Sequence, residues 1–110
     1  MPYAGTDFSP IGIGSQQLLS FDYVNLLATG ETVDGATWTS LVVAGTDAAS
    51  PNDIINGSAS IAGSIVTQMI DLTDTTNVVD ANVYLLTCAA VTSLGQTILV
   101  WAHLTTVTPA

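Results

Sequence analysis

The sequence predicts an all-β fold, an antiparallel two-sheet sandwich of the immunoglobulin type with about seven strands and an extended N-terminal arm. The composition disfavours helix, because sixteen of the 110 residues are Thr, only one is Glu, and none is Lys or Arg. Short apolar segments are separated by turn residues about every 8 to 12 positions, a spacing typical of a sandwich. Several segments also alternate apolar and polar residues, the period of a strand with one buried face. A small jelly roll is the alternative that these observations leave open.

Residues 1–16 are predicted to form the extended arm, and residues 17–110 the sandwich domain. The arm contains two Pro and three Gly and has no sustained period. Its Tyr3, Phe8 and Ile11 make it too apolar for a disordered tail. Two placements fit this composition, against a neighbouring subunit or against its own sandwich. A chain without residues 1–15 that folds but no longer assembles would indicate the first.

The sandwich is predicted to begin with two strands. Apolar and polar residues alternate through residues 19–23, which indicates a strand with one buried face. Turn residues at 28–30 and at Asp34-Gly35 then interrupt the chain. The second strand is predicted over residues 36–43, with Trp38 as its core anchor.

The middle of the chain is predicted to contain three short strands, residues 54–55, 58–61 and 65–71. Asn56-Gly57 is a strong turn dipeptide and separates the first two of these strands. Gly63-Ser64 separates the second from the third. Polar loops are predicted over residues 47–53 and 72–80.

The last third of the chain gives the clearest strand pattern. Residues 82–92 and 96–106 flank Ser93-Leu94-Gly95, a hairpin connection in which Gly95 supplies a positive φ. Alternation predicts two faces for the second arm of the hairpin, one with Ile98, Val100, Ala102 and Leu104, the other with Thr97, Leu99, Trp101, His103 and Thr105. Both faces contain large apolar residues, so the hairpin is either covered on both sides or meets another subunit with its outer face. The predicted core includes Phe21, Trp38, Ile98 and Val100.

The charge balance excludes several classes of partner. The chain has nine acidic residues, no Lys and no Arg, and therefore a net charge of −9. Binding to nucleic acid or to an anionic membrane surface needs cationic side chains, so neither partner is expected. Acidic residues could match a basic patch on another protein, or could only keep an apolar chain soluble. No segment approaches the roughly 20 apolar residues of a spanning helix, and no basic secretory signal begins the chain.

No catalytic, metal or cofactor site is predicted. Ser, His and Asp all occur, but His103 lies mid-strand beside Trp101 and is expected at a surface or an interface. Asp71, Asp74 and Asp80 could offer hard oxygen ligands to calcium, yet their spacing is not that of an EF-hand, and a solvated loop is expected. The single cysteine, Cys88, is expected to be a buried, inert thiol.

Short motifs resemble a family of small tailed-bacteriophage structural proteins, the fiber-tail adaptor or immunoglobulin-like virion proteins. They are Phe21-Asp22-Tyr23 with Leu26-Leu27, Gly30-Glu31-Thr32-Val33, and Ala36-Thr37-Trp38-Thr39. The closing hairpin, from Val83-Tyr84-Leu85-Leu86-Thr87 through the segment 97–105, is similar to the closing hairpin of the family, with Gly95 and Thr97 in place. The likeness covers roughly residues 18–106.

The resemblance implies a non-enzymatic virion protein, synthesised in the host cytoplasm, that joins fiber or tail subunits. Its partners would be other phage structural proteins and copies of itself. Apolar residues make up 48% of this short chain, more than one thin core readily covers, so a homo-oligomer or a multi-copy assembly is expected. The residues predicted at contacts are Tyr3, Phe8, Ile11, Leu99, Trp101 and His103. A capsid decoration (cement) protein is the alternative within this class, and a carbohydrate-binding module is one from another class.

Overall fold

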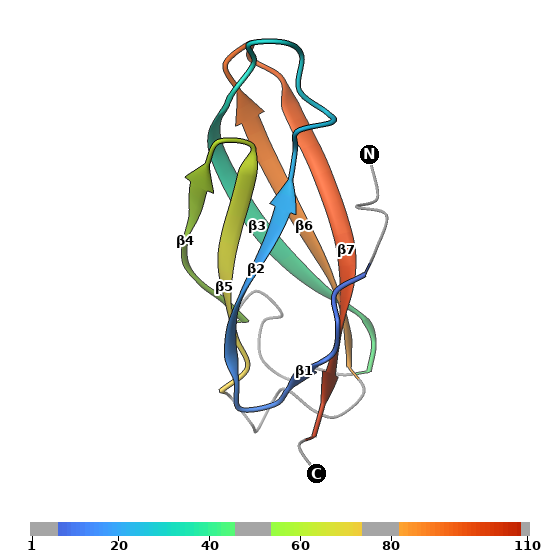
Figure 1. Ribbon diagram of the computed structural model, residues 1–110. Helices are drawn as coiled ribbons and strands as arrows, with labels where there is room; N and C mark the ends of the chain where they lie inside the picture. The colour runs from blue at the N-terminus through green and yellow to red at the C-terminus, as the bar shows by residue number, and fades with distance from the viewer. Residues whose placement is uncertain (1–6, 46–53, 74–81, 109–110) are drawn as a thin grey trace.

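Seven strands form two sheets that pack face to face (Figure 1). The computed structural model describes residues 7–45, 54–73 and 82–108. The strands are β1 (Ile11–Gly12), β2 (Gln16–Asp22), β3 (Val33–Ala44), β4 (Ile55–Ala62), β5 (Ile65–Asp71), β6 (Val83–Thr92) and β7 (Thr97–Val107). Within the described residues, no helix is long and apolar enough to cross a membrane.

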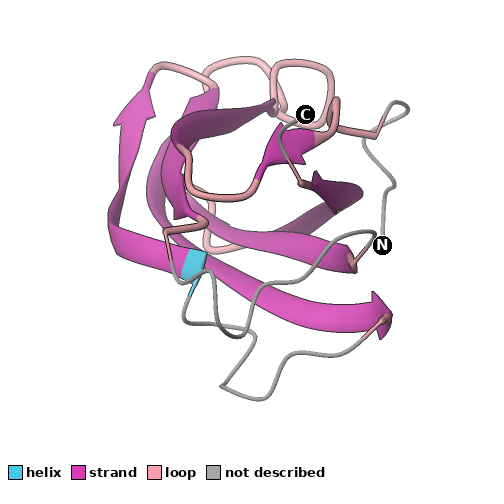
Figure 2. Cartoon of the chain, turned by 90° about the horizontal axis from the view of Figure 1, so that it is seen from below, coloured by secondary structure: helices cyan, strands magenta, loops and turns pink. Residues whose placement is uncertain are grey.

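The strand order is that of an immunoglobulin-like sandwich. One sheet has the order β1-β7-β6-β3 and the other β2-β5-β4. The set β3-β6-β7 facing β2-β5-β4 corresponds to the C-F-G and B-E-D sheets of immunoglobulin domains. All pairs are antiparallel except β1 with β7, which are parallel. Figure 2 shows the two layers from below. The prediction of a two-sheet all-β sandwich is therefore confirmed.

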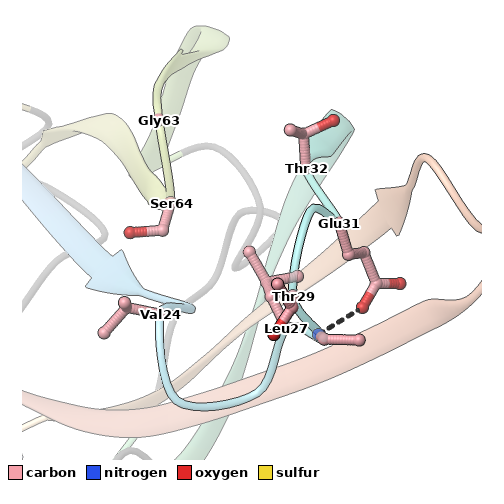
Figure 3. Close-up of a pocket in the computed structure, with 8 residues that line it drawn as sticks. Val24, Leu27, Thr29, Glu31, Thr32, Gly63 and Ser64 are labelled. Atoms are coloured by element: carbon pink, nitrogen blue, oxygen red, sulfur yellow. Dashed lines mark hydrogen bonds between the residues drawn. The ribbon is translucent and has the colours of Figure 1, made fainter.

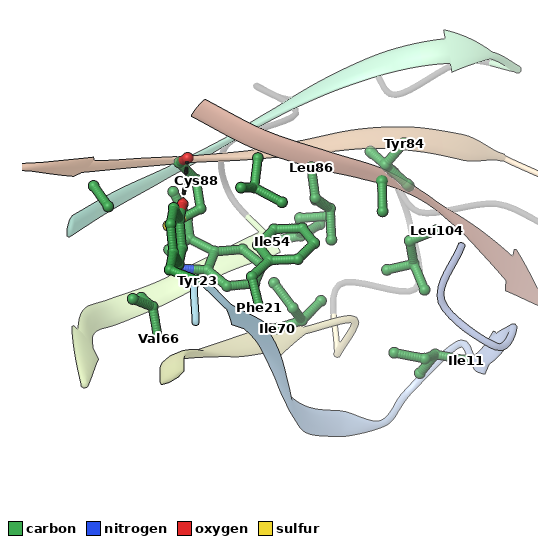
Figure 4. Close-up of a cluster of buried hydrophobic side chains, with 14 of the residues drawn as sticks. Ile11, Phe21, Tyr23, Ile54, Val66, Ile70, Tyr84, Leu86, Cys88 and Leu104 are labelled. Carbon is green, nitrogen blue, oxygen red and sulfur yellow. Dashed lines mark hydrogen bonds between the residues drawn. The ribbon is translucent and has the colours of Figure 1, made fainter. Parts of the chain in front are cut away.

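The core lies between the sheets (Figure 4) and contains an aromatic pair. Trp38 of β3 and Phe21 of β2 are buried, and their rings stack with centroids 4.7 Å apart. Immunoglobulin domains pack the corresponding tryptophan against an inter-sheet disulfide. Here Phe21 packs against the tryptophan in place of a disulfide, and Cys88 is a buried free thiol. Val100 is also buried and Ile98 packs against the core, so the predicted core residues are confirmed.

Tyr23 joins the two sheets by a polar bond within the apolar core. Its side chain is fully buried, and its hydroxyl donates a hydrogen bond of 2.8 Å to the carbonyl of Cys88 on β6 (Figure 4). Burial raises the pKa of Tyr23, so the phenol stays protonated and remains a donor.

The described part of the arm packs against its own sandwich. The backbone N–H of Phe8 donates to the carbonyl of His103, and the Phe8 ring lies 5.3 Å from that of Phe21. Ile11 in β1 is 2% exposed and belongs to the core. Of the two placements that the sequence allowed, residues 7–15 thus follow the intramolecular one. Tyr3 lies outside the described residues.

Two dipeptides predicted as chain breaks are β-bulges inside strands. Asn56-Gly57 does not end a strand, because β4 continues from Ile55 to Ala62 and its register with β5 shifts between Asn56 and Ser60. Gly57 has a φ of 75°, which glycine adopts at low cost both in a turn and in a bulge. Asp34-Gly35 similarly lies within β3, where the register with β6 shifts. The predicted strands 54–55 and 58–61 are therefore replaced by one strand that begins at Ile55 and not at Ile54.

The predicted hairpin connection at residues 93–95 and the predicted separation of two strands at Gly63-Ser64 are both confirmed. Gly63-Ser64 connects β4 to β5, and Gly63 has a φ of 62°. Gly95 has a φ of 78° in the connection between β6 and β7. Most of the predicted loops, residues 47–53 and 72–80, lies outside the described residues.

Candidate interaction surface

The outer side of the β1-β7-β6-β3 sheet is apolar and is here called the β3-β6-β7 face. Inward residues such as Trp38, Leu86 and Val100 are buried, so the residues that alternate with them point outward. The outward residues are Thr37, Thr39 and Leu41 of β3, Leu85, Thr87, Ala89 and Val91 of β6, and Thr97, Leu99, Trp101 and His103 of β7. None of these residues carries a carboxylate, but β3 also has the exposed Asp34 near its start and the exposed Val43 near its end.

The strand register aligns the side chains of this face in rows across the sheet. The leucine row is Leu41–Leu85–His103, the middle row is Thr39–Thr87–Trp101, and the alanine row is Thr37–Ala89–Leu99. Leu41 is 60% exposed and Val91 is 47% exposed, whereas Leu85, Leu99 and Trp101 are half-buried. The hairpin of β6 and β7 is therefore central in its sheet, but large apolar side chains at its edge with β3 remain open to solvent.

The outer side of the β2-β5-β4 sheet differs in charge. Asp22 of β2 and Asp71 of β5 lie near its two ends, with Leu18 exposed between them. The Asp22 carboxylate accepts hydrogen bonds from the Ser64 hydroxyl at 2.7 Å and from the Val24 N–H at 2.9 Å, which lower its pKa. The β2-β5-β4 sheet thus carries carboxylates on its outer side, whereas those of the β3-β6-β7 face lie at its margins, at Asp34 of β3 and at Asp7 beside His103.

The arm crosses the edge of the β3-β6-β7 face at His103. Asp7 Oδ1 accepts the backbone N–H of His103 at 2.9 Å and lies 3.3 Å from His103 Nδ1. The Trp101 ring meets the His103 ring edge-on, with centroids 5.9 Å apart. Through these contacts, His103 holds the arm against β7.

An open pocket of about 430 Å³ lies at the end of the sandwich near the β4–β5 turn (Figure 3). Its lining includes Val24, Leu27, Glu31 and Ser64. One Glu31 carboxylate oxygen accepts the Ala28 N–H at 2.9 Å, as Figure 3 shows, and the other accepts the Thr92 hydroxyl. The bond from Thr92, and then that from Ala28, lowers the pKa of Glu31. This carboxylate therefore fastens the loop between β2 and β3 to β6 and is already engaged within the chain.

The acidic loop considered for calcium is only partly described. The Asp71 carboxylate accepts hydrogen bonds from Thr73, from Gln16 at 3.0 Å and from Asn56 at 3.3 Å. The bonds from Thr73 make the largest contribution to lowering its pKa. Asp74 and Asp80 lie outside the described residues. In the part of the chain that the structure describes, no three His, Cys, Asp or Glu residues are grouped as metal ligands.

The structure separates the predicted contact residues into two groups. Leu99, Trp101 and His103 lie together on the β3-β6-β7 face. Phe8 and Ile11 instead pack in the core of their own chain, because the arm closes the open side of the sandwich. Burial also raises the pKa of the Cys88 thiol, as expected for an inert cysteine.

Sequence reasoning did not single out the β3 side of this face. Alternation along the predicted strand 36–43, with Trp38 inward, is enough to predict that Leu41 points outward. The pairing of Leu41 with Leu85 depends on the neighbourhood of β3 and β6, which alternation along one strand does not give. The sequence matches no protein-family model, and no curated protein or solved structure matches it.

Proposed function

We propose that this chain is a non-enzymatic structural protein of a bacteriophage particle, an adaptor that joins fiber or tail subunits. The single observation that carries the proposal is the apolar β3-β6-β7 face, where Leu41 and Val91 are exposed, on a chain of net charge −9. The resemblance of residues 21–39 and of the closing hairpin to small phage structural proteins supports its placement in a virion.

The exposed apolar area of this face favours a contact with other subunits. Fully burying a side chain such as that of Leu41 stabilises by about 1.5–3 kcal/mol relative to leaving it in water. Leu41 is 60% exposed and Val91 is 47% exposed, so covering each of them by a neighbouring subunit would add about half of this stabilisation. Apolar side chains gathered on one face mark an interaction site more often than the same side chains scattered singly.

Because the arm packs on its own chain, the proposed contact with other subunits lies on the sheet and not on the arm. Phe8 and Ile11 contribute to the chain's own core and are not available to a neighbour while the arm is docked. The proposed contact surface is therefore made by Leu41, Leu85 and Leu99 with Trp101 beside them.

Phage particles purified from the host that carries the gene test this function. Mass spectrometry is expected to find the chain in the particles, and incorporation is expected to fall at least tenfold for the double variant Leu99→Ala, Trp101→Ala. Leu18→Ala on the opposite outer side serves as the control and should be incorporated normally. Particles that lack the wild-type chain would refute a virion role, and full incorporation of the double variant would refute the contact surface.

A capsid decoration protein is the second candidate, and copy number separates it from an adaptor. A small, fixed number of copies per particle supports the adaptor, because a tail or neck offers few equivalent positions. A number that grows with the capsid surface would instead assign the chain to decoration of the head.

A further inference from the structure

We infer that the free edge of β2 binds an extended segment of a partner protein, which extends the β2-β5-β4 sheet as an antiparallel strand and places a Lys or Arg opposite Asp22. This edge is separate from the β3-β6-β7 face, so binding to it can be tested on the isolated chain and apart from the proposed function. Backbone pairing, the regularity of the edge, half-buried apolar side chains and charge all point to such an occupant.

Every second residue of β2 turns its backbone N–H and C=O away from the sheet. β2 is an edge strand and pairs with β5 on one side only (Figure 1). Just before β2, the Leu72 N–H donates to the Ser15 carbonyl at 2.9 Å. Just after it, the Tyr23 N–H donates to the Ser64 carbonyl at 2.8 Å, so the odd-numbered residues exchange hydrogen bonds with β5. The even-numbered residues point their backbone groups to the edge, and they are Gln16, Leu18, Ser20 and Asp22.

β2 is the most regular of the four edge strands that the structure describes. Native sheets protect exposed edges with short strands, bulges, prolines or lysines. β1 has only two residues, and register shifts interrupt the pairing of β3 and of β4. β2 instead pairs with β5 over all seven residues without a shift and contains no Pro, Gly or Lys. Such an edge is the kind of template to which an extended peptide adds as a further strand.

An added strand would also cover apolar side chains that the chain itself leaves half-buried. Leu19 of β2 packs against the core and is half-buried. Phe8 of the arm is also half-buried, and its ring lies 5.3 Å from that of Phe21 on β2. Every second side chain of an added strand would lie on this inner side of the sheet, beside Leu19. The fitting segment therefore has apolar residues at these alternate positions.

Charge selects a basic partner over a second copy of the chain. Each copy has a net charge of −9 and no Lys or Arg, so repulsion opposes the pairing of two β2 edges. At one end of the edge, the Asp22 carboxylate accepts the bonds from Ser64 and Val24 on the same oxygen, Oδ1. Its Oδ2 accepts no hydrogen bond from the described residues, and the residue is exposed. A Lys or Arg opposite Asp22 would bond to Oδ2 and complement the charge of the chain.

An NMR titration of the isotope-labelled full chain with a designed peptide tests the inference. The probe is acetyl-Lys-Val-Thr-Val-Val-Thr-Thr-amide, which in an antiparallel pair places its Lys opposite Asp22 and its fifth residue opposite Leu18. We expect a Kd below about 1 mM, with the largest shifts and slowed hydrogen exchange at the amides of Leu18 and Ser20. No binding up to that concentration, or shifts confined to other strands, would overturn the inference.

Two N-methylated forms of this peptide test the backbone pairing with matched composition and charge. Methyl groups on the third and fifth nitrogen atoms replace N–H groups that would bond to β2, whereas those on the second and fourth replace N–H groups that point away from it. The first form should bind at least about tenfold more weakly than the unmodified peptide, and the second about equally well. A second form that binds no better than the first would contradict strand addition.

Two variants of the chain separate the backbone of the edge from its side chains. Ser20→Pro removes one N–H at the edge, a position at which a folded edge strand tolerates proline, and should weaken binding of the peptide by at least about tenfold. Leu18→Ala keeps every backbone group and should change binding by less than about fivefold. Circular dichroism verifies that both variants fold. Unchanged binding by a folded Ser20→Pro chain would refute the site.

A second pair of variants tests the predicted cation. Asp22→Asn and Asp34→Asn each remove one exposed carboxylate and change the net charge equally. Asp22→Asn should weaken binding by about two- to fivefold, as expected for an exposed ion pair, and Asp34→Asn should not. Equal effects of the two variants would show that no Lys or Arg lies opposite Asp22.

Discussion

Gln68 is a polar residue that stabilises an irregular point in the core. It lies on β5 between the buried Val66 and Ile70, and is itself 2% exposed. Its amide nitrogen donates to the carbonyls of Asn56 at 2.8 Å and of Gly57 at 3.2 Å, which the bulge in β4 removes from regular pairing with β5. The side chain thus replaces the backbone partners that the bulge takes away.

Replacing Gln68 by Leu should destabilise the fold although it makes the core more apolar. The two carbonyls would lose their donor, and an unsatisfied buried acceptor costs about 1–3 kcal/mol. Urea unfolding followed by circular dichroism measures this change. Thr67→Val, on the outward side of the same strand, is the control and should change the free energy of unfolding by less than about 0.5 kcal/mol. Equal stability of Gln68→Leu and wild type would show that the bulge does not need this donor.

Neither the inward position of Gln68 nor its partners could be predicted from residues 65–71, because both faces of this strand contain apolar residues, Val66 and Ile70 on one and Ile65 and Met69 on the other. Asn-Gly has the same local signature in a hairpin turn and in a bulge, because both accept a glycine with positive φ. The choice between them depends on whether β5 continues beside β4 past Gly57, and that pairing is a property of the folded sheet.

At the scale of elements, the arm closes one side of the sandwich. Phe8 packs on the aromatic pair of Phe21 and Trp38, and Ile11 fills the space beside β7. β1 is only two residues long and pairs in parallel with β7, so nothing in local alternation announces it. The β6-β7 hairpin is the opposite case, because alternation along its second strand is enough to predict which side chains share each face.

Truncating Phe8 should loosen the arm without unfolding the sandwich. Removing a fully buried Phe side chain costs about 3–5 kcal/mol, and Phe8 is half-buried, so Phe8→Ala should cost about 1–2 kcal/mol. Chemical denaturation gives the free energy, and amide hydrogen exchange at His103 should accelerate because its N–H bonds to Asp7. Leu94→Ala, at an exposed turn position, is the control and should leave both unchanged. Unaltered exchange at His103 in Phe8→Ala would contradict an arm held by this ring.

At the scale of the whole molecule, neutral hydrogen-bond donors take the place of Lys and Arg as partners of the carboxylates. Asp22, Glu31 and Asp71 all have a pKa lowered by hydrogen bonds, chiefly from Ser64, Thr92 and Thr73 respectively. With no Lys or Arg available, hydroxyl, amide and backbone N–H groups make these bonds. Each bond is strongest when its carboxylate is ionised.

Stability should therefore fall in acid. A carboxyl with a lowered pKa in the folded state binds fewer protons there than in the unfolded chain, so its contribution is full above the unfolded pKa of about 4 and is lost as the pH falls through the folded value. We expect the Tm to be nearly constant from pH 8 to 5 and to decrease below about pH 4. Glu31→Gln should show a smaller decrease, as measured by calorimetry. A Tm that rises on acidification would show that mutual repulsion of the nine carboxylates dominates instead.

The lone thiol of this chain sits on β6, in the interior strand of its sheet, with its side chain sealed between the two layers. Because this thiol is buried, a maleimide or iodoacetamide can reach it only in molecules whose layers have come apart. The reaction reports on this residue alone, because the chain has no other cysteine. The rate of alkylation under native conditions therefore measures how often the sandwich opens, in the wild-type chain and without any added label.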